Sequence, residues 1–85
     1  MKPTQGPWGF ESFALSEEII AMGGKLVAVV QSRHCESPEE MRANAALIAA
    51  APDMLDALEY WMDVGDDHKA IDKAREAIAK ARGTQ

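Results

Sequence analysis

The sequence has one cysteine, few aromatic residues and no long apolar run. A single cysteine, Cys35, excludes an internal disulfide and a cysteine-rich zinc site. The longest apolar stretches, residues 26–30 and 45–51, are far shorter than the roughly 20 residues that a membrane-spanning helix needs. No secretory hydrophobic segment follows the first residue. We therefore expect a soluble protein of a reducing, intracellular compartment, with no membrane partner.

Basic residues are scarce, above all in the middle of the chain. The net charge is −5, which disfavours direct binding to a nucleic-acid duplex. Residues 36–67 hold nine acidic residues against Arg42 alone, whereas residues 68–85 hold more bases than acids. This asymmetry predicts an acidic surface suited to a basic partner protein.

The chain of 85 residues is short, enough for one domain with a β-rich part (1–35) and a helical part (36–85). A domain of this size buries only about 60% of the surface of its unfolded chain. We therefore expect a homo-oligomer, a dimer or larger.

The first part has the pattern of β-strands. Two apolar runs, residues 19–22 and 26–30, are separated by Gly23-Gly24, which indicates a hairpin with a type I′ turn and positive φ at both glycines. Trp8 and Phe10 alternate with the period of a strand. These signals predict a small antiparallel sheet of two or three strands. A short helix capped by Ser16-Glu17-Glu18 and running through Ile20 remains an alternative.

The second part predicts three helices. The signals are a capping box at Ser37, Pro52 as a break, and Gly83 after the last helix. Asp66 or Asp67 should cap the third helix. The expected helices cover residues 37–51, 53–64 and 68–82. We expect all three to pack on one face of the sheet, which gives an α+β fold.

The helices differ in their apolar sides. The third helix has a stripe made mostly of alanine, which buries little area per residue. The second has larger residues, which we expect to face the core: Met54, Leu55, Leu58, Trp61 and Met62.

Four carboxylates lie on one side of the second helix: Asp53, Asp56, Glu59 and Asp63. Such a stripe is either a solvated face or a docking face for a basic partner protein. A further interpretation sets it against the basic third helix of another copy. The docking face is the sharper hypothesis.

Three other residues, Trp8, Lys25 and Arg33, are candidates for a nucleotide ligand held between copies of the chain. The alternative for each tryptophan is burial in the core, and the glycines before Lys25 fit a turn better than a phosphate loop. Cys35 and its neighbours lack the spacing of a metal site, so we expect a structural role and no metal. No catalytic set or cofactor motif is present, which favours a non-enzymatic protein.

Three segments carry a resemblance: Gly6-Pro7-Trp8, residues 43–59 with their Ala-Asn-Ala and Leu-Ile-Ala-Ala-Ala-Pro-Asp runs, and residues 74–81. They resemble a group of small proteins encoded by tailed bacteriophages and prophages. The resemblance implies a bacterial host cytoplasm and brings no catalytic residues. It suggests an accessory protein that binds and inhibits a host factor, such as a CRISPR defence complex. A sponge for a cyclic nucleotide signal and a structural or regulatory oligomer are the alternatives.

Overall fold

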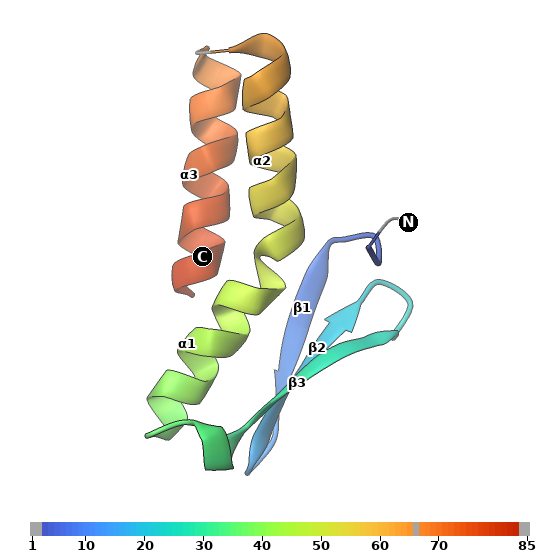
Figure 1. Ribbon diagram of the computed structural model, residues 1–85, viewed down its shortest axis with the longest axis vertical. Helices are drawn as coiled ribbons and strands as arrows, with labels where there is room; N and C mark the ends of the chain where they lie inside the picture. The colour runs from blue at the N-terminus through green and yellow to red at the C-terminus, as the bar shows by residue number, and fades with distance from the viewer. Residues whose placement is uncertain (1–2, 66, 84–85) are drawn as a thin grey trace.

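The computed structural model describes residues 3–65 and 67–83 (Figure 1). Three strands form an antiparallel sheet in the order β1-β2-β3, and three helices follow, which confirms the α+β class. The short helix considered for residues 16–20 is absent, because that segment belongs to β2. The elements are β1 (Trp8–Ser12), β2 (Ser16–Ala21), β3 (Leu26–Gln31), a 3-10 turn η1 (Ser32–His34), α1 (Pro38–Ala49), α2 (Ala51–Val64) and α3 (His68–Arg82).

The hairpin between β2 and β3 depends on its two glycines. Gly23 and Gly24 have φ values of 88° and 85°, as predicted. The N–H of Gly24 donates to the carbonyl of Ala21 at 3.0 Å, so the central residues of the turn are Met22 and Gly23. The predicted type I′ turn is wrong, because it requires positive φ at both central residues and no described residue other than glycine has it. Positive φ at the second central position is the requirement of a type II turn.

Local capping chemistry sets the helix ends. Ser37 Oγ accepts the N–H of Glu40 at 3.1 Å, and Asp67 Oδ1 accepts the N–H of Ala70 at 2.8 Å. Asp67 is thus the cap of α3, whereas Asp66 lies outside the described residues. Gly83, with φ of 73°, ends α3 as predicted.

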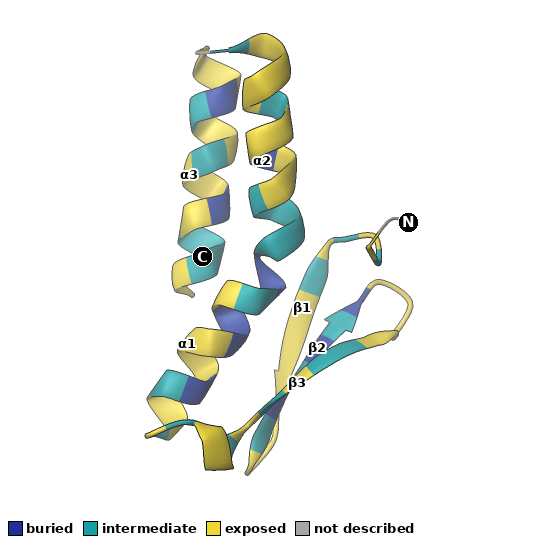
Figure 2. Cartoon of the chain, in the orientation of Figure 1, coloured by how far each residue is buried: buried dark blue, intermediate teal, exposed yellow. Residues whose placement is uncertain are grey.

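The core lies between the sheet and α1. Ile19 of β2 packs against Ala45 and Ala49 of α1, with Trp8 of β1 at their side. The indole N–H of Trp8 donates to the carbonyl of Thr4 at 3.1 Å. Trp8 is half-buried and packs against the core, in the direction of the expected core role. Small α1 residues let that helix lie close to the strands, and Figure 2 shows the most buried positions along this contact.

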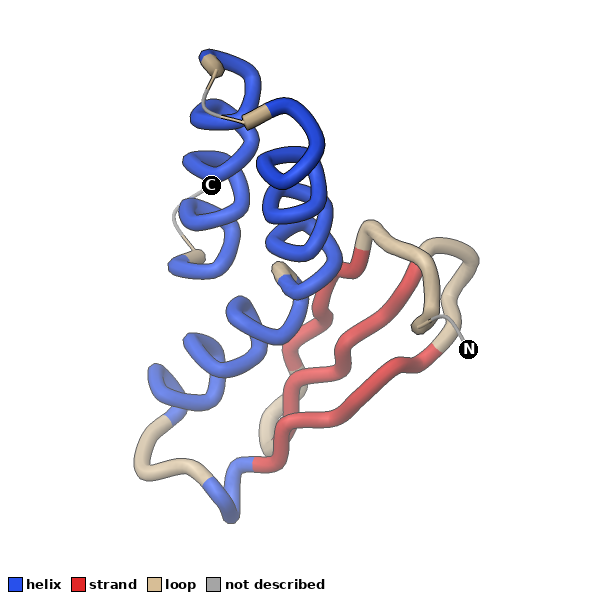
Figure 3. Tube along the Cα trace, turned by 45° about the horizontal axis from the view of Figure 1, so that its top comes forward, coloured by secondary structure: helices blue, strands red, loops and turns tan. Residues whose placement is uncertain are grey.

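The other two helices form an antiparallel hairpin that extends beyond the sheet (Figures 1 and 3). The principal helix–sheet contacts come from α1, while α2 packs mainly against α3. Alanines make this contact close: Ala57, Ala70 and Ala77 are buried. The Lys73 ammonium lies 5.2 Å from the centre of the Tyr60 ring, adding a cation–π contact between the two helices.

The N-terminal segment contacts the start of α2. A Cβ built on Gly6 would lie 2.5 Å from Cβ of Pro52, closer than two carbons can approach. Gly6 is therefore required by this packing. Two segments on which the resemblance was based, around residues 6–8 and 51–53, meet here in space.

Candidate functional site

Three apolar residues of α2 are exposed on one side of the helix. Leu55, Leu58 and Met62 follow one another at helical spacing and are 48%, 65% and 85% exposed. The expectation that this apolar side faces the core is wrong for these three residues, whereas Met54 is half-buried. With about 100° per residue, the opposite side of the helix carries Ala57, which is buried. Ala57 faces the alanine stripe of α3, where the close contact of the two helices leaves room only for a small residue. The larger apolar side chains of α2 therefore lie on the solvent side.

Trp61 also departs from the prediction. Trp61 is 40% exposed, and it is not among the residues that pack around Ile19 and Ala45 in the core. Burial in the core was the interpretation for both tryptophans, and of the two only Trp8 packs against the core. An indole at the border of an apolar stripe adds amphipathic contact area to that surface.

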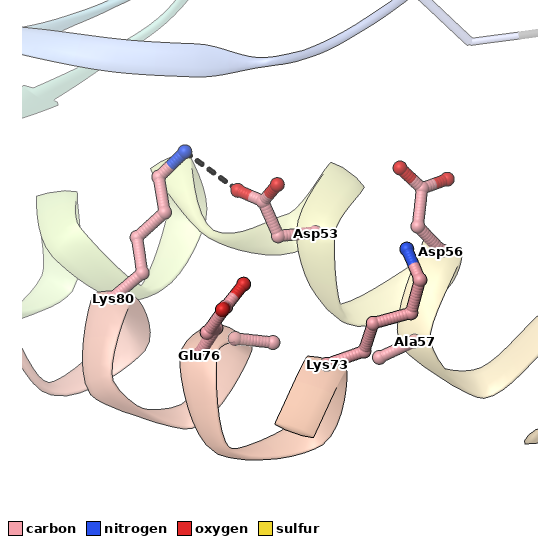
Figure 4. A pocket seen from close by; sticks show the side chains of 7 residues that line it. Asp53, Asp56, Ala57, Lys73, Glu76 and Lys80 are labelled. Carbon is pink, nitrogen blue, oxygen red and sulfur yellow. Dashed lines mark hydrogen bonds and ion pairs between the residues drawn. The ribbon is translucent and has the colours of Figure 1, made fainter. Parts of the chain in front are cut away.

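The structure divides the predicted acidic stripe into two pairs. Asp53 Oδ2 lies 2.6 Å from Nζ of Lys80, in a half-buried ion pair between α2 and α3. Asp53 and Asp56 also line a cleft of about 160 Å³ together with Lys73 and Glu76 of α3 (Figure 4). The basic third helix of the same chain thus faces these two carboxylates. One interpretation of the acidic stripe set it against the basic third helix of another copy. For Asp53 this is unnecessary, because Lys80 of the same chain is its partner.

The second pair, Glu59 and Asp63, is exposed and free of the cleft. The four-residue spacing places both on one side of α2, beside the apolar residues. We call the combined set the α2 outer surface, and it consists of Leu55, Leu58, Glu59, Met62 and Asp63. Chemically it offers an apolar strip with an acidic border.

The candidates for a nucleotide site do not converge within one chain. Trp8 belongs to the core, and Lys25 and Arg33 flank opposite ends of β3. Six strand residues span about 20 Å. Arg33 Nε donates to Oε1 of Gln31 at 3.0 Å and to Nε2 of His34 at 3.2 Å, so its Nε–H is engaged locally.

Cys35 is half-buried beside α1. Its sulfur accepts a weak hydrogen bond from Nδ2 of Asn44 at 3.6 Å. In the described ranges, 3–65 and 67–83, no three His, Cys, Asp or Glu side chains gather as metal ligands would. The cysteine instead lines an apolar groove between β3 and α1.

Fold and surface together define a small α+β protein with a projecting helical hairpin and an exposed apolar helix face. The chain belongs to the family of Salmonella phage P22 protein Y8K6, whose model matches residues 1–85. The phage origin implied by the resemblance is confirmed, and the match extends over the β-rich part as well. No curated protein and no solved structure matches the chain. Within the described part of the chain, no helix is long and apolar enough to cross a membrane.

Proposed function

We propose that this phage protein acts in the host cytoplasm as a non-enzymatic inhibitor that binds a host protein through the α2 outer surface. The observation that carries the proposal is the row of exposed apolar side chains at Leu55, Leu58 and Met62. Burying one such side chain contributes about 1.5–3 kcal/mol. An amphipathic helix that presents residues at this spacing fits the apolar groove of a partner protein.

The acidic border defines the chemistry of that partner. Glu59 and Asp63 would face basic residues at the rim of the groove and so orient the two proteins during encounter. Host proteins that handle nucleic acid have such basic surfaces, because they bind phosphates. A defence complex that recognises nucleic acid, such as a CRISPR effector, has the matching charge and is a natural target for a phage protein.

The first experiment compares two double variants of equal composition. Leu58→Ala with Met62→Ala removes apolar contact from α2. Leu15→Ala with Met22→Ala is the matched control, since these residues are 72% and 75% exposed and lie in the loops of the sheet. Circular dichroism should show both variants folded. We expect the purified partner, once captured from host lysate, to bind the control like the wild type and the α2 variant at least tenfold more weakly.

A second variant tests the charge separately. Glu59→Lys with Asp63→Lys should slow association and reduce its dependence on salt, since charges at a rim act mainly on the association rate. The matching biological readout is plaque formation on a host whose CRISPR system targets the phage. Equal protection by wild type and by both α2 variants would contradict the proposal.

The alternative of a nucleotide sponge requires Trp8, Lys25 and Arg33 from different copies, and Trp8 is already engaged in the core. A thermal-shift screen with cyclic di- and trinucleotides tests it directly. A shift of several degrees that survives the α2 substitutions would favour the sponge. If no nucleotide shifts the melting temperature and no host protein is captured, the structural or regulatory oligomer is the function that these results favour.

A further inference from the structure

One edge of the sheet is formed by β3, which pairs only with β2 among the strands of the described residues. The N–H of Ser32 donates to the carbonyl of Leu15 at 2.9 Å, on the side of β2. Successive residues of an antiparallel strand alternate in this direction. Val29 and Gln31, which lie opposite Glu18 and Ser16, therefore direct their backbone groups away from β2. The carbonyl of Gln31, the N-cap of η1, also accepts the first hydrogen bond of that turn, so Val29 and the N–H of Gln31 are the groups open to a further strand. Both residues are exposed.

An apolar groove of about 360 Å³ runs beside this edge, between β3 and α1. Val29 and Val30 line one wall, and Leu47 and Ile48 of α1 line the other. Leu47 is 52% exposed although it lies next to the core. Edge and groove thus form a continuous surface of backbone polar groups and aliphatic side chains.

The β3 edge lacks the features that usually protect an edge strand. Its sequence, Leu-Val-Ala-Val-Val-Gln, contains no charged residue and no proline, in a chain of net charge −5. The opposite edge, β1, carries Glu11 and begins directly after Pro7. Charged residues and prolines block strand addition at edges. Strand addition is therefore favoured at β3 over β1.

We propose that a second copy of this chain pairs with β3 in antiparallel orientation, about a twofold axis near Val30. In this register Val29 of each copy lies opposite Gln31 of the other, and the N–H of each Gln31 donates to the carbonyl of Val29 in the other copy. The product is a six-stranded sheet with the two α1 helices side by side over the seam.

Uncharged edges favour a second copy over a foreign strand. Two copies of β3 meet without like-charge repulsion, even though the whole chains repel each other. The twofold axis also presents each surface to itself, and Leu47 of one α1 approaches Leu47 of the other. A stable dimer buries about 800 Å² per subunit, more than a strand edge of about 20 Å supplies. The α1 contact is therefore part of the interface.

Two substitutions test the interface by different means. Leu47→Glu places like charges face to face across the seam, and Val29→Pro removes an N–H that β2 does not use. Sedimentation equilibrium should give a dimer for the wild type and the 9.2 kDa monomer for both variants at the same concentration. Leu58→Glu is the control on α2, and it should remain dimeric.

Amide exchange measured by NMR identifies the strand. At high concentration the amides of Val29 and Gln31 should become at least tenfold more protected than at low concentration. The amide of Phe10 is the control, because Phe13 donates to Ser16 at 2.8 Å and the alternation directs Phe10 away from β2 at the other edge. Its exchange should not change with concentration.

Each contrary result overturns the proposal. A monomer at all concentrations up to millimolar excludes the dimer. A dimer that Leu58→Glu dissociates and Leu47→Glu does not, or in which Val29 and Gln31 stay unprotected, assigns self-association to another surface. Protection of these amides only after addition of host lysate would indicate a foreign strand. The proposal is independent of host binding through α2, which the monomeric Leu47→Glu variant should retain.

Discussion

The Ser12 hydroxyl donates a 2.6 Å hydrogen bond to Oε2 of Glu17, a carboxylate that is completely buried under α1. The other oxygen, Oε1, is buried and accepts no hydrogen bond from the described residues. Arg42 Nε lies 3.8 Å from it, and that guanidinium is mostly exposed. The buried carboxyl group of Glu17 therefore depends on Ser12 for its one short hydrogen bond.

Ser12→Ala should lower the free energy of unfolding by about 1–3 kcal/mol, because it leaves a buried carboxylate with one polar partner fewer. Introducing Glu17→Leu as well should restore or raise stability, since an apolar residue of similar size has no desolvation cost. Urea denaturation of the two single variants and the double variant gives the coupling energy. Additive effects would contradict the dependence of Glu17 on Ser12.

The hairpin gives a second prediction. Gly23→Val with Gly24→Val should destabilise the protein by about 1–3 kcal/mol, because valine tolerates positive φ poorly. Gly9→Val in β1 is the control, since Gly9 has no positive φ and a Cβ there meets no atom within 4 Å. Thermal melting should show the control equal to or more stable than the wild type. An unchanged double variant would argue against the turn.

Close packing of α2 on α3 gives a third prediction. Ala77→Leu should destabilise the protein by about 1–3 kcal/mol, because Ala77 is buried at the contact and leaves no room for three further carbons. The same change at the exposed Ala43 of α1 should alter stability by less than about 0.5 kcal/mol. Equal melting temperatures for the two variants would show that the hairpin is loosely packed.

The ion pair of Asp53 and Lys80 gives a fourth prediction. Lys80→Met keeps most of the aliphatic stem and removes the charge, so it should cost no more than about 1 kcal/mol at low salt. Lys69→Met, at an exposed position in the first turn of α3, is the control. The difference between the two variants should shrink in 1 M salt, where screening acts over about 3 Å. A difference independent of salt would point to packing.

The elements that sequence analysis predicted well depend on local chemistry. The cap at Ser37, the end of α3 at Gly83 and the positive φ of Gly23 follow from the residues within a turn or two. Such signals need no knowledge of the remaining fold. The type of hairpin turn was predicted wrongly because it depends on where the hydrogen-bonded pairing of β2 with β3 ends. The turn closes at Ala21, which makes Met22 and Gly23 its central residues.

The candidate site could be predicted only in part. Helical periodicity identifies the apolar side of α2. It does not predict that α3 packs against Ala57 and that Leu58 is exposed. Likewise, the acidic stripe was visible, whereas the partner of Asp53 lies at Lys80, 27 residues away. Burial of Glu17 had no clear signal, because β2 contains Glu-Glu followed by Ile-Ile and so does not show which of its two faces is apolar.

The projection of the α2–α3 hairpin beyond the sheet has a consequence for valency. Since α2 takes little part in covering the sheet, its outer surface and the β3 edge belong to separate parts of one small chain. Two chains joined at β3 would therefore present two equivalent helices to the same target or to neighbouring copies of it. A second attachment made from the same molecule acts at an effective concentration of about millimolar, which can strengthen a weak single contact by two orders of magnitude or more.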